Sequence, residues 1–346
     1  MKPTKQLTIA AGLAAIVLNA IPTTKAAADE STVAGDAQTK VQLRRNQFNG
    51  KPDTDLVDTV VRGTVDYKIS EQIGLRARGV AEASSVPNVD RRLQDGDQLG
   101  YEFSVDRADI RIKLKEIGLT LGETDNPFAP SIPQMDKDTP LVGAVVSTPI
   151  VEGVKIQFVY DAGRRLTDDT NSSMVGIQLL GDKKLENMTL TGNLGYQHGI
   201  AFDERYRLSN SHDLSTDILS AGGSVTLNDT FLGAVKGFVE YTHNFGMEEN
   251  TDAAMTGIKI GETKEKGDIS ATFQYRYVGK DALLAGTTVR DSPGTNFDIW
   301  TIKVEGKVAD NVTIYAANFN PKHIIPAGPK DNERQHVVEI GVEIKF

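Results

Sequence analysis

The feature that most constrains this chain is a period-two alternation of apolar and polar residues that recurs along most of the sequence. Between positions 336 and 346, the even-numbered residues from Val338 to Phe346 are apolar, whereas Glu339, Glu343 and Lys345 stand between them. This period predicts a β-strand with one apolar face and one polar face. The same alternation recurs at 57–69, 107–114, 154–161, 269–277 and 300–308. We therefore expect an all-β chain.

The polar face of these strands carries Arg, Lys, Asp and Glu, and this decides where the sheet can lie. So many ionisable groups cannot be buried in the dry core of a soluble barrel, because unpaired buried charge is too costly. In a bilayer, a closed barrel can turn its apolar face to lipid and its charged face to a water-filled lumen, and closure leaves no unpaired strand edge. Outside the N-terminus there is no run of eighteen apolar residues, which excludes a bundle of membrane-spanning helices. The predicted fold class is an all-β transmembrane antiparallel barrel.

The pattern predicts about sixteen strands, joined alternately by tight polar turns and by long loops. Short turns on one side and long loops on the other are typical of outer-membrane barrels, whose strands are normally even in number. An even number also places both termini on the side of the short turns. The predicted strands are residues 38–47, 56–69, 73–84, 101–114, 117–124, 141–149, 154–162, 174–181, 188–198, 217–227, 231–243, 254–262, 268–278, 297–308, 312–319 and 335–346.

The first residues predict a secretory signal peptide. Two Lys residues precede an apolar stretch at 7–21, which is short for a membrane-spanning helix. Small residues follow, and cleavage after Ala26 or Ala28 fits the usual A-x-A pattern. We therefore expect residues 1–28 to be a signal peptide and residues 29–346 to form the barrel. The alternative is that the first segment is retained as an N-terminal anchor.

Composition narrows the class of function further. The chain has 47 Asp and Glu residues against 38 Lys and Arg residues, and this acidic balance argues against nucleic-acid binding. The absence of Cys excludes disulfides, thiolate metal sites and cysteine nucleophiles. The His residues lack metal-ligand spacing such as H-x-x-x-H, and no motif holds a nucleophile beside a base. We therefore expect no cofactor, no metal site and no enzymatic activity.

Two stretches resemble motifs of Gram-negative outer-membrane proteins. The alternating last strand, which ends at Phe346, resembles the assembly signature of outer-membrane β-barrels. Residues 117–128 resemble the fifth strand and following loop of the general diffusion porins, although Glu123 stands where that family usually has Arg. The matching residues are Gly118, Leu121, Gly122 and Pro127. The resemblance implies a pore in outer-membrane lipid, inserted by the barrel assembly machinery and assembled as a homotrimer.

The same resemblance implies a constriction formed by the loop after the fifth strand. This loop, residues 125–140, carries Asp125, Asp136 and Asp138. Strands two to four carry charged residues at positions that the alternation turns to the lumen, namely Arg62, Arg76, Arg78, Arg107, Asp109 and Arg111. Arginines and acids on opposite sides of a narrow gap would bias the passage of ions, as rings of charged side chains do in pores. The alternative is that these charges only keep the lumen wet and pair across neighbouring strands.

The sequence thus predicts an outer-membrane porin that passes ions and small hydrophilic solutes by diffusion, with Phe346 as its assembly signal. Three alternatives stay open. One is a substrate-specific channel, for example for anions such as phosphate. The others are a barrel enzyme with an active site at its rim and a receptor barrel with a plugged lumen. Conductance separates an open pore from a plugged barrel, and substrate turnover would identify an enzyme.

Overall fold

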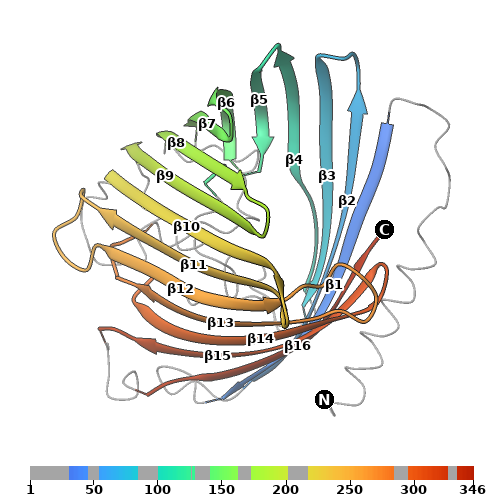
Figure 1. Cartoon of the computed structure of the whole chain (residues 1–346), viewed down its shortest axis with the longest axis vertical. Helices are drawn as coiled ribbons and strands as arrows, with labels where there is room; N and C mark the ends of the chain where they lie inside the picture. Colours follow the sequence, from blue (N-terminus) through green and yellow to red (C-terminus); the bar gives the residue numbers. More distant parts are fainter. Residues whose placement is uncertain are drawn as a thin grey trace.

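The computed structural model describes residues 31–45, 54–84, 100–125, 127–128, 141–162, 173–201, 217–283, 295–325 and 333–346. These residues form sixteen antiparallel strands, each paired with the next along the chain, and β1 pairs with β16 to close a barrel (Figure 1). The strands are β1 (Ser31–Arg45), β2 (Thr54–Lys68), β3 (Ile73–Ser84), β4 (Gly100–Leu114), β5 (Ile117–Thr124), β6 (Leu141–Val151), β7 (Val154–Asp161), β8 (Ser173–Lys184), β9 (Met188–Ala201), β10 (Asp217–Thr230), β11 (Gly233–Asn244), β12 (Asp252–Gly261), β13 (Ile269–Val278), β14 (Phe297–Ala309), β15 (Val312–His323) and β16 (His336–Lys345). Within the described ranges, no helix is long and apolar enough to cross a membrane.

The structure confirms the predicted fold class and the predicted number of strands. The main difference is at β1, which begins at Ser31, whereas the alternation predicted a first strand at 38–47. The small residues Gly35 and Ala37 interrupt the apolar face there, so the pattern is weak. The segment is a strand because it pairs with β2 from Ser31 opposite Tyr67 onward. The predicted signal peptide lies outside the described residues.

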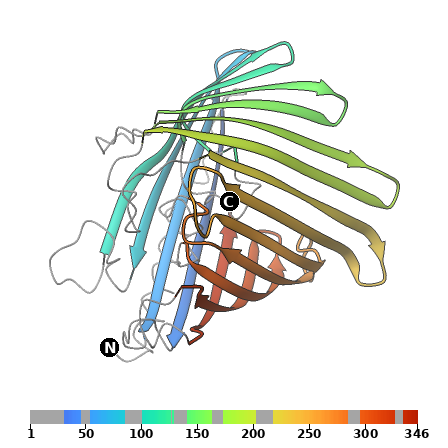
Figure 2. The same cartoon turned by 90° about the vertical axis from the view of Figure 1, so that its left-hand side faces the viewer.

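The connections differ in length at the two ends of the barrel, as the sequence predicted. Six hairpins close through turns of two to four residues, namely β2–β3, β4–β5, β6–β7, β8–β9, β10–β11 and β14–β15. The green and yellow hairpins in Figure 2 show these turns gathered at one end of the barrel. Because the number of strands is even, Ser31 and Phe346 also lie at the end with the short turns.

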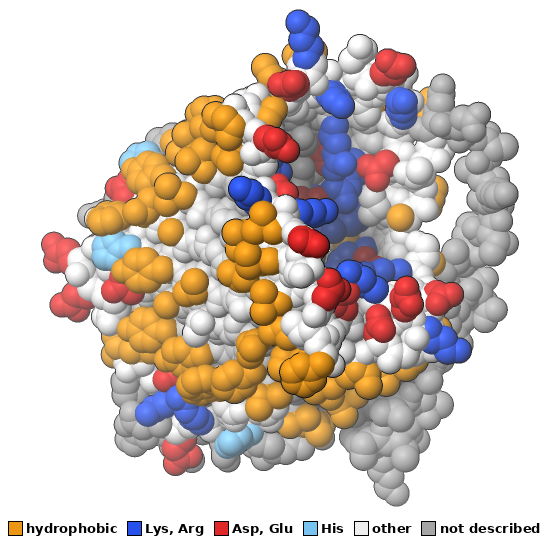
Figure 3. Space-filling view, viewed as in Figure 1, with side chains coloured by type: hydrophobic (Ala, Val, Ile, Leu, Met, Phe, Trp, Pro, Cys, Tyr) orange, Lys and Arg blue, Asp and Glu red, His pale blue; other side chains and the backbone are white. Residues whose placement is uncertain are grey.

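The outer face of the barrel is apolar, as contact with lipid requires. Figure 3 shows orange apolar side chains over the outside of the strands. Exposed apolar residues on this face include Val65, Leu194, Val239 and Ile302. The Trp300 ring stacks on Phe273 at 5.3 Å between centroids and lies 4.5 Å from the Tyr275 ring. Near the long-loop end, the Tyr196 hydroxyl donates a hydrogen bond of 2.7 Å to Asp217. Aromatic residues with polar tips suit the interface between lipid and water.

The barrel closes where β1 meets β16, and Phe346 lies at this seam. The Gly35 N–H donates to the Phe346 carbonyl at 2.7 Å, and the Phe346 N–H donates to the Gly35 carbonyl at 2.9 Å. The Phe346 ring lies over Gly35, so closely that a Cβ atom at this glycine would collide with it. The last residue therefore completes the pairing that closes the barrel. Its role as an assembly signal stays a prediction.

Candidate functional site

The charged inner wall of β2–β4 is built around a β-bulge in β4. Arg78 pairs in register with Arg107, whereas the next residue, Gly79, pairs with Val105, so Asp106 is the extra residue. A bulge redirects side chains locally. Here the two successive residues Asp106 and Arg107 both join the charged cluster, while Val105 is exposed on the outer face. The bulge therefore adds a carboxylate to a wall of arginines.

Arg107 is the most deeply buried charged residue of this wall. Its side chain is 0% exposed, and its Nε donates to Asp125 Oδ1 at 2.9 Å. Its Nη1 donates to the Asp106 backbone carbonyl at 2.5 Å. Arg78 donates two hydrogen bonds to the Asp106 carboxylate, at 2.8 and 2.5 Å. A buried guanidinium needs such partners, because charge taken out of water without them is too costly.

Asp125 ties the beginning of the loop after β5 to this wall. Besides accepting from Arg107, its Oδ2 accepts from Arg76 Nη1 at 2.6 Å. Partial burial raises the pKa of the Asp125 carboxyl, but the hydrogen bond from Arg107 and the charge of Arg76 outweigh burial and hold that pKa below its usual 3.8. The carboxylate, which lies outside the strands, is therefore ionised at neutral pH.

The depressed pKa of Asp125 predicts how an Asp125→Asn variant depends on pH. A carboxyl whose folded-state pKa lies below its unfolded value stabilises the fold above the unfolded pKa, and this contribution is lost as pH falls through the folded pKa. We expect the parent to unfold at higher urea concentration than Asp125→Asn at neutral pH. The difference between their urea midpoints should shrink below about pH 4. Urea titrations in lipid vesicles, followed by the fluorescence of Trp300, measure this difference. A difference that does not change with pH would contradict the lowered pKa of Asp125.

The other predicted wall residues are paired in the same way. Arg62 Nη1 lies 3.0 Å from Asp36 Oδ2 on β1. Arg111 donates from Nε to Asp109 at 2.8 Å, and its Nη1 lies 3.7 Å from Asp66. Each arginine therefore meets an acid on its own or a neighbouring strand, or at the start of the following loop. Among the described residues, these charges pair along one wall. Asp136 and Asp138 lie outside the described residues.

Phe128 lies inside the barrel, on the wall formed by β6–β9. Its side chain is 1% exposed and belongs to a buried apolar cluster with Leu141, Val145, Val159 and Met174. The ring lies against two glycines, since a Cβ atom would stand 2.5 Å from its Cζ at Gly176 and 3.7 Å from its Cδ1 at Gly195. The loop after β5 therefore enters the barrel at least as far as Phe128.

Gly122 lets the chain turn inward just before this loop. Its φ is +118°, a backbone conformation that residues with a side chain rarely adopt. A Cβ atom here would also collide with the carbonyl of Ala108 on β4. The alternation breaks at this point, because the next two residues, Glu123 and Thr124, are both buried. The second glycine of the sequence motif therefore stands at a position that suits glycine alone.

The structure brings the predicted arginines together on the inner wall, and sequence reasoning missed two of the residues that organise them. Asp106 was missed because strict alternation turns either it or Arg107 to the lumen, and only a bulge allows both. In the sequence, Phe128 was only the last residue of the porin-like stretch 117–128, and its contact with the inner wall was not predicted. Its burial depends on the glycines opposite, and Gly176 within an alternating apolar strand was the one available signal. Among the described residues, no cluster of His, Asp and Glu could hold a metal ion.

Comparison with known proteins identifies relatives in structure. No family model matches the chain, and no curated protein is similar to it in sequence. OprB of Pseudomonas putida, in a structure at high pH, is similar over 92% of this chain and 94% of its own, with a TM-score of 0.65 and 12% identity. A variant of the Rhodobacter blastica porin is similar over 91% of this chain and 100% of its own, with a TM-score of 0.53 and 10% identity. An engineered protein described for its asymmetric conductivity is similar over 92% and 100%, with a TM-score of 0.52 and 12% identity.

The chain therefore has the fold of the outer-membrane porins, as the sequence predicted. It is a closed antiparallel barrel of sixteen strands, and its similarity to solved porins extends over nearly the whole chain. At this low sequence identity the likeness concerns the fold alone. What the barrel does must be argued from its own residues.

Proposed function

We propose that this protein is a channel through which ions and small hydrophilic solutes diffuse passively. The observation that carries the proposal is the charged inner wall of β2–β4, which faces the interior of a closed barrel with an apolar exterior. Figure 3 shows blue Lys and Arg side chains along the hollow beside these strands. Charged groups of this density need water on their side of the wall, and water in a closed barrel makes a path for solutes.

The porin fold supports the same proposal. One of the similar structures is described for its conductivity, and the others are porins or OprB. We further propose that the chain is exported by its first 28 residues and inserted into outer-membrane lipid by the barrel assembly machinery. A homotrimer is part of the proposal, because it is what the resemblance to general porins implies. A diffusion pore needs neither a cofactor nor a catalytic nucleophile.

Single-channel recording from the refolded, signal-free protein in a planar bilayer tests the proposal. We expect stepwise, long-lived openings whose conductance increases with salt concentration, because the current is carried through a water-filled path. Heat-dependent mobility in detergent gels confirms separately that the barrel has folded. Folded protein that adds no current would contradict the channel and would favour a plugged receptor barrel. Solute turnover by the purified barrel would instead identify an enzyme.

A further inference from the structure

A second set of charges lines the inner wall near the short-turn end of the barrel. Several lysines lie within four residues of the short-turn end of their strands, on the face opposite the apolar outer residues. Lys184 and Lys345, the last residues of β8 and β16, are among them, and we call the other six the lysine belt. Its members are Lys68 on β2, Lys113 on β4, Lys155 on β7, Lys236 on β11, Lys259 on β12 and Lys307 on β14. Neighbours such as Tyr67, Leu114, Ile258 and Val308 are exposed on the opposite face.

The lysine belt differs from the arginine wall in its lack of counter-charges. Within the described ranges, Lys259 is the one member of the belt that forms an ion pair, at 3.4 Å from Glu305. Glu305 is shared with Lys303, whose Nζ lies 2.7 Å from it. The arginines, in contrast, each meet a carboxylate. Among the described residues, most members of the belt therefore have no carboxylate within ion-pairing distance.

Two members of the belt face each other directly. Lys236 on β11 and Lys259 on β12 are register partners, and both lie on the inner face. Like charges directly opposite each other across two strands destabilise a sheet. Folding alone gives no reason to place two lysines here, since a neutral residue at either position would remove the repulsion. A solute carrying negative charge would relieve it whenever it passed.

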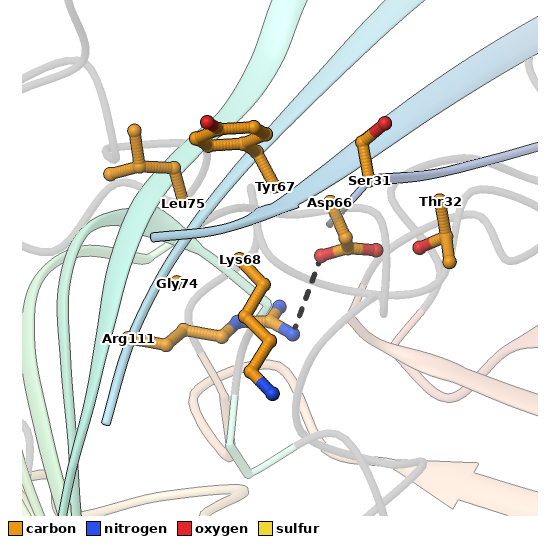
Figure 4. Close-up of a pocket in the computed structure, with 8 residues that line it drawn as sticks. All are labelled: Ser31, Thr32, Asp66, Tyr67, Lys68, Gly74, Leu75 and Arg111. Atoms are coloured by element: carbon orange, nitrogen blue, oxygen red, sulfur yellow. Dashed lines mark ion pairs between the residues drawn. The ribbon is translucent and has the colours of Figure 1, made fainter. Parts of the chain in front are cut away.

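The belt also borders a recess in the inner wall. Lys68, Arg111 and Lys113 line a cavity of about 490 Å³ together with the hydroxyl groups of Thr120 and Ser147 and the carboxylates of Glu71 and Glu116. A second cavity of about 250 Å³ adjoins it and shares Lys68 and Arg111. Figure 4 shows these two side chains at the second cavity, with the ion pair between Arg111 and Asp66. The three cationic groups of the first recess outnumber its two carboxylates, and with the hydroxyl donors they are suited to an oxyanion.

The carboxylates near the belt do not cancel its charge. On the inner wall, Asp66 is engaged by Arg111, Glu305 by two lysines, and Glu343 by Lys345 at 3.5 Å. Asp182 lies at the end of β8. Glu71 and Glu116 lie on turns beyond the strand ends and line the first cavity, where they offset part of the charge of Lys68, Arg111 and Lys113. Charges in open water are screened within about 8 Å, whereas a channel with low-dielectric walls concentrates the field of the charges that line it.

We infer that the lysine belt is the selectivity element of this channel and that it favours small anionic solutes bearing carboxylate or phosphate groups. Rings of Lys or Arg side chains bias pores toward anions and phosphate. The arginine wall contributes less, because its charges are neutralised in place. This inference rests on the proposed function, since selectivity requires an open pore.

The test combines four substitutions of the belt, Lys68→Gln, Lys113→Gln, Lys155→Gln and Lys236→Gln. The matched control is Lys115→Gln with Lys183→Gln, Lys264→Gln and Lys266→Gln, which removes the same charge from the turns and from an outward position near the end of β8. Reversal potentials in a potassium chloride gradient are measured for the parent and both variants. We expect an anion-selective parent, a several-fold lower chloride-to-potassium permeability ratio in the belt variant, and little change in the control.

Two results would overturn the inference while leaving the channel intact: a cation-selective parent, or a belt variant with the permeability ratio of the parent. A second measurement does not depend on current. Inorganic phosphate should bind saturably to the detergent-solubilised parent in calorimetric titration, and the double variant Lys68→Gln, Lys113→Gln should lose this binding. Unchanged phosphate binding in that variant would remove the recess from the anion path. A folded barrel that is silent in the bilayer would instead contradict the proposed function.

Discussion

Phe128→Ala is expected to raise single-channel conductance without preventing the barrel from folding. The Phe128 ring holds the loop after β5 against the inner wall, where it is 1% exposed among Leu141, Val145 and other apolar side chains. Truncating a buried Phe to Ala costs about 3–5 kcal/mol. Phe128 lies outside the strands, so this cost weakens the docking of the loop while the strand pairing remains intact. Once Phe128 no longer anchors the segment after β5 to the wall, the current should become larger and noisier.

The reciprocal change should have the same effect. In Gly176→Ala the new Cβ atom would stand 2.5 Å from the Phe128 ring and 3.0 Å from the Tyr196 carbonyl, so the ring must move. Gly237→Ala is the matched control, because nothing lies within 4 Å of that position. Phe231→Ala is a second control, since this Phe is 96% exposed on a turn. Conductance equal to that of the parent in both Phe128→Ala and Gly176→Ala would show that this loop does not narrow the path.

The strands could be predicted from the sequence because a membrane barrel allows them little freedom. Every backbone group must be paired within the barrel, and every second side chain must face lipid. β16 illustrates this, since its apolar residues alternate without a break up to Phe346. β1 was placed seven residues late at its start because Gly35 and Ala37 contribute little apolar surface to its outer face. This part of β1 is a strand because it pairs with β2. Such pairing cannot be recognised from the local alternation of apolar and polar residues.

The register of the arginines could be predicted, but their electrostatic state could not. Arg62, Arg76 and Arg111 alternate with apolar residues, so their direction follows from period two alone. An arginine can face an acid across the lumen or pair with an acid on the same wall. Which of these occurs depends on distances between strands. The structure places Asp36 beside Arg62 and Asp125 beside Arg76. Pairing of this kind leaves less free charge than the count of arginines indicates.

The same reasoning explains why the lysine belt escaped attention in the sequence. Its members lie on strands far apart along the chain, from Lys68 to Lys307, and no motif links them. Only the closed order of the strands brings them to the same end of the lumen. Their lack of counter-charges is likewise a property of the assembled wall. The belt therefore exists only in the folded barrel, and no single strand indicates it.

Gly35→Val is expected to prevent stable closure of the barrel. A Cβ atom at this position would collide with the Phe346 ring and stand 2.6 Å from the Arg62 carbonyl. Overpacking in a well-packed site costs about 1–3 kcal/mol, and valine adds two methyl groups beyond the Cβ atom. The cost falls on the pairing between β1 and β16, which joins the two ends of the barrel through the reciprocal bonds of Gly35 and Phe346.

Gly63→Val is the matched control, because Gly63 is the register partner of Gly35 on β2 and nothing lies within 4 Å of its Cβ position. Valine is favoured in strands, and this position is exposed on the apolar face, so the control should fold at least as well as the parent. Heat-dependent mobility in detergent gels measures the closed fraction of each variant. We expect Gly35→Val to lose the compact form. Gly35→Val with Phe346→Ala, which removes the ring but leaves the Arg62 carbonyl, should recover part of it. Equal closed fractions for the two glycine variants would show that the seam tolerates side chains and that Phe346 closes the barrel by backbone bonds alone.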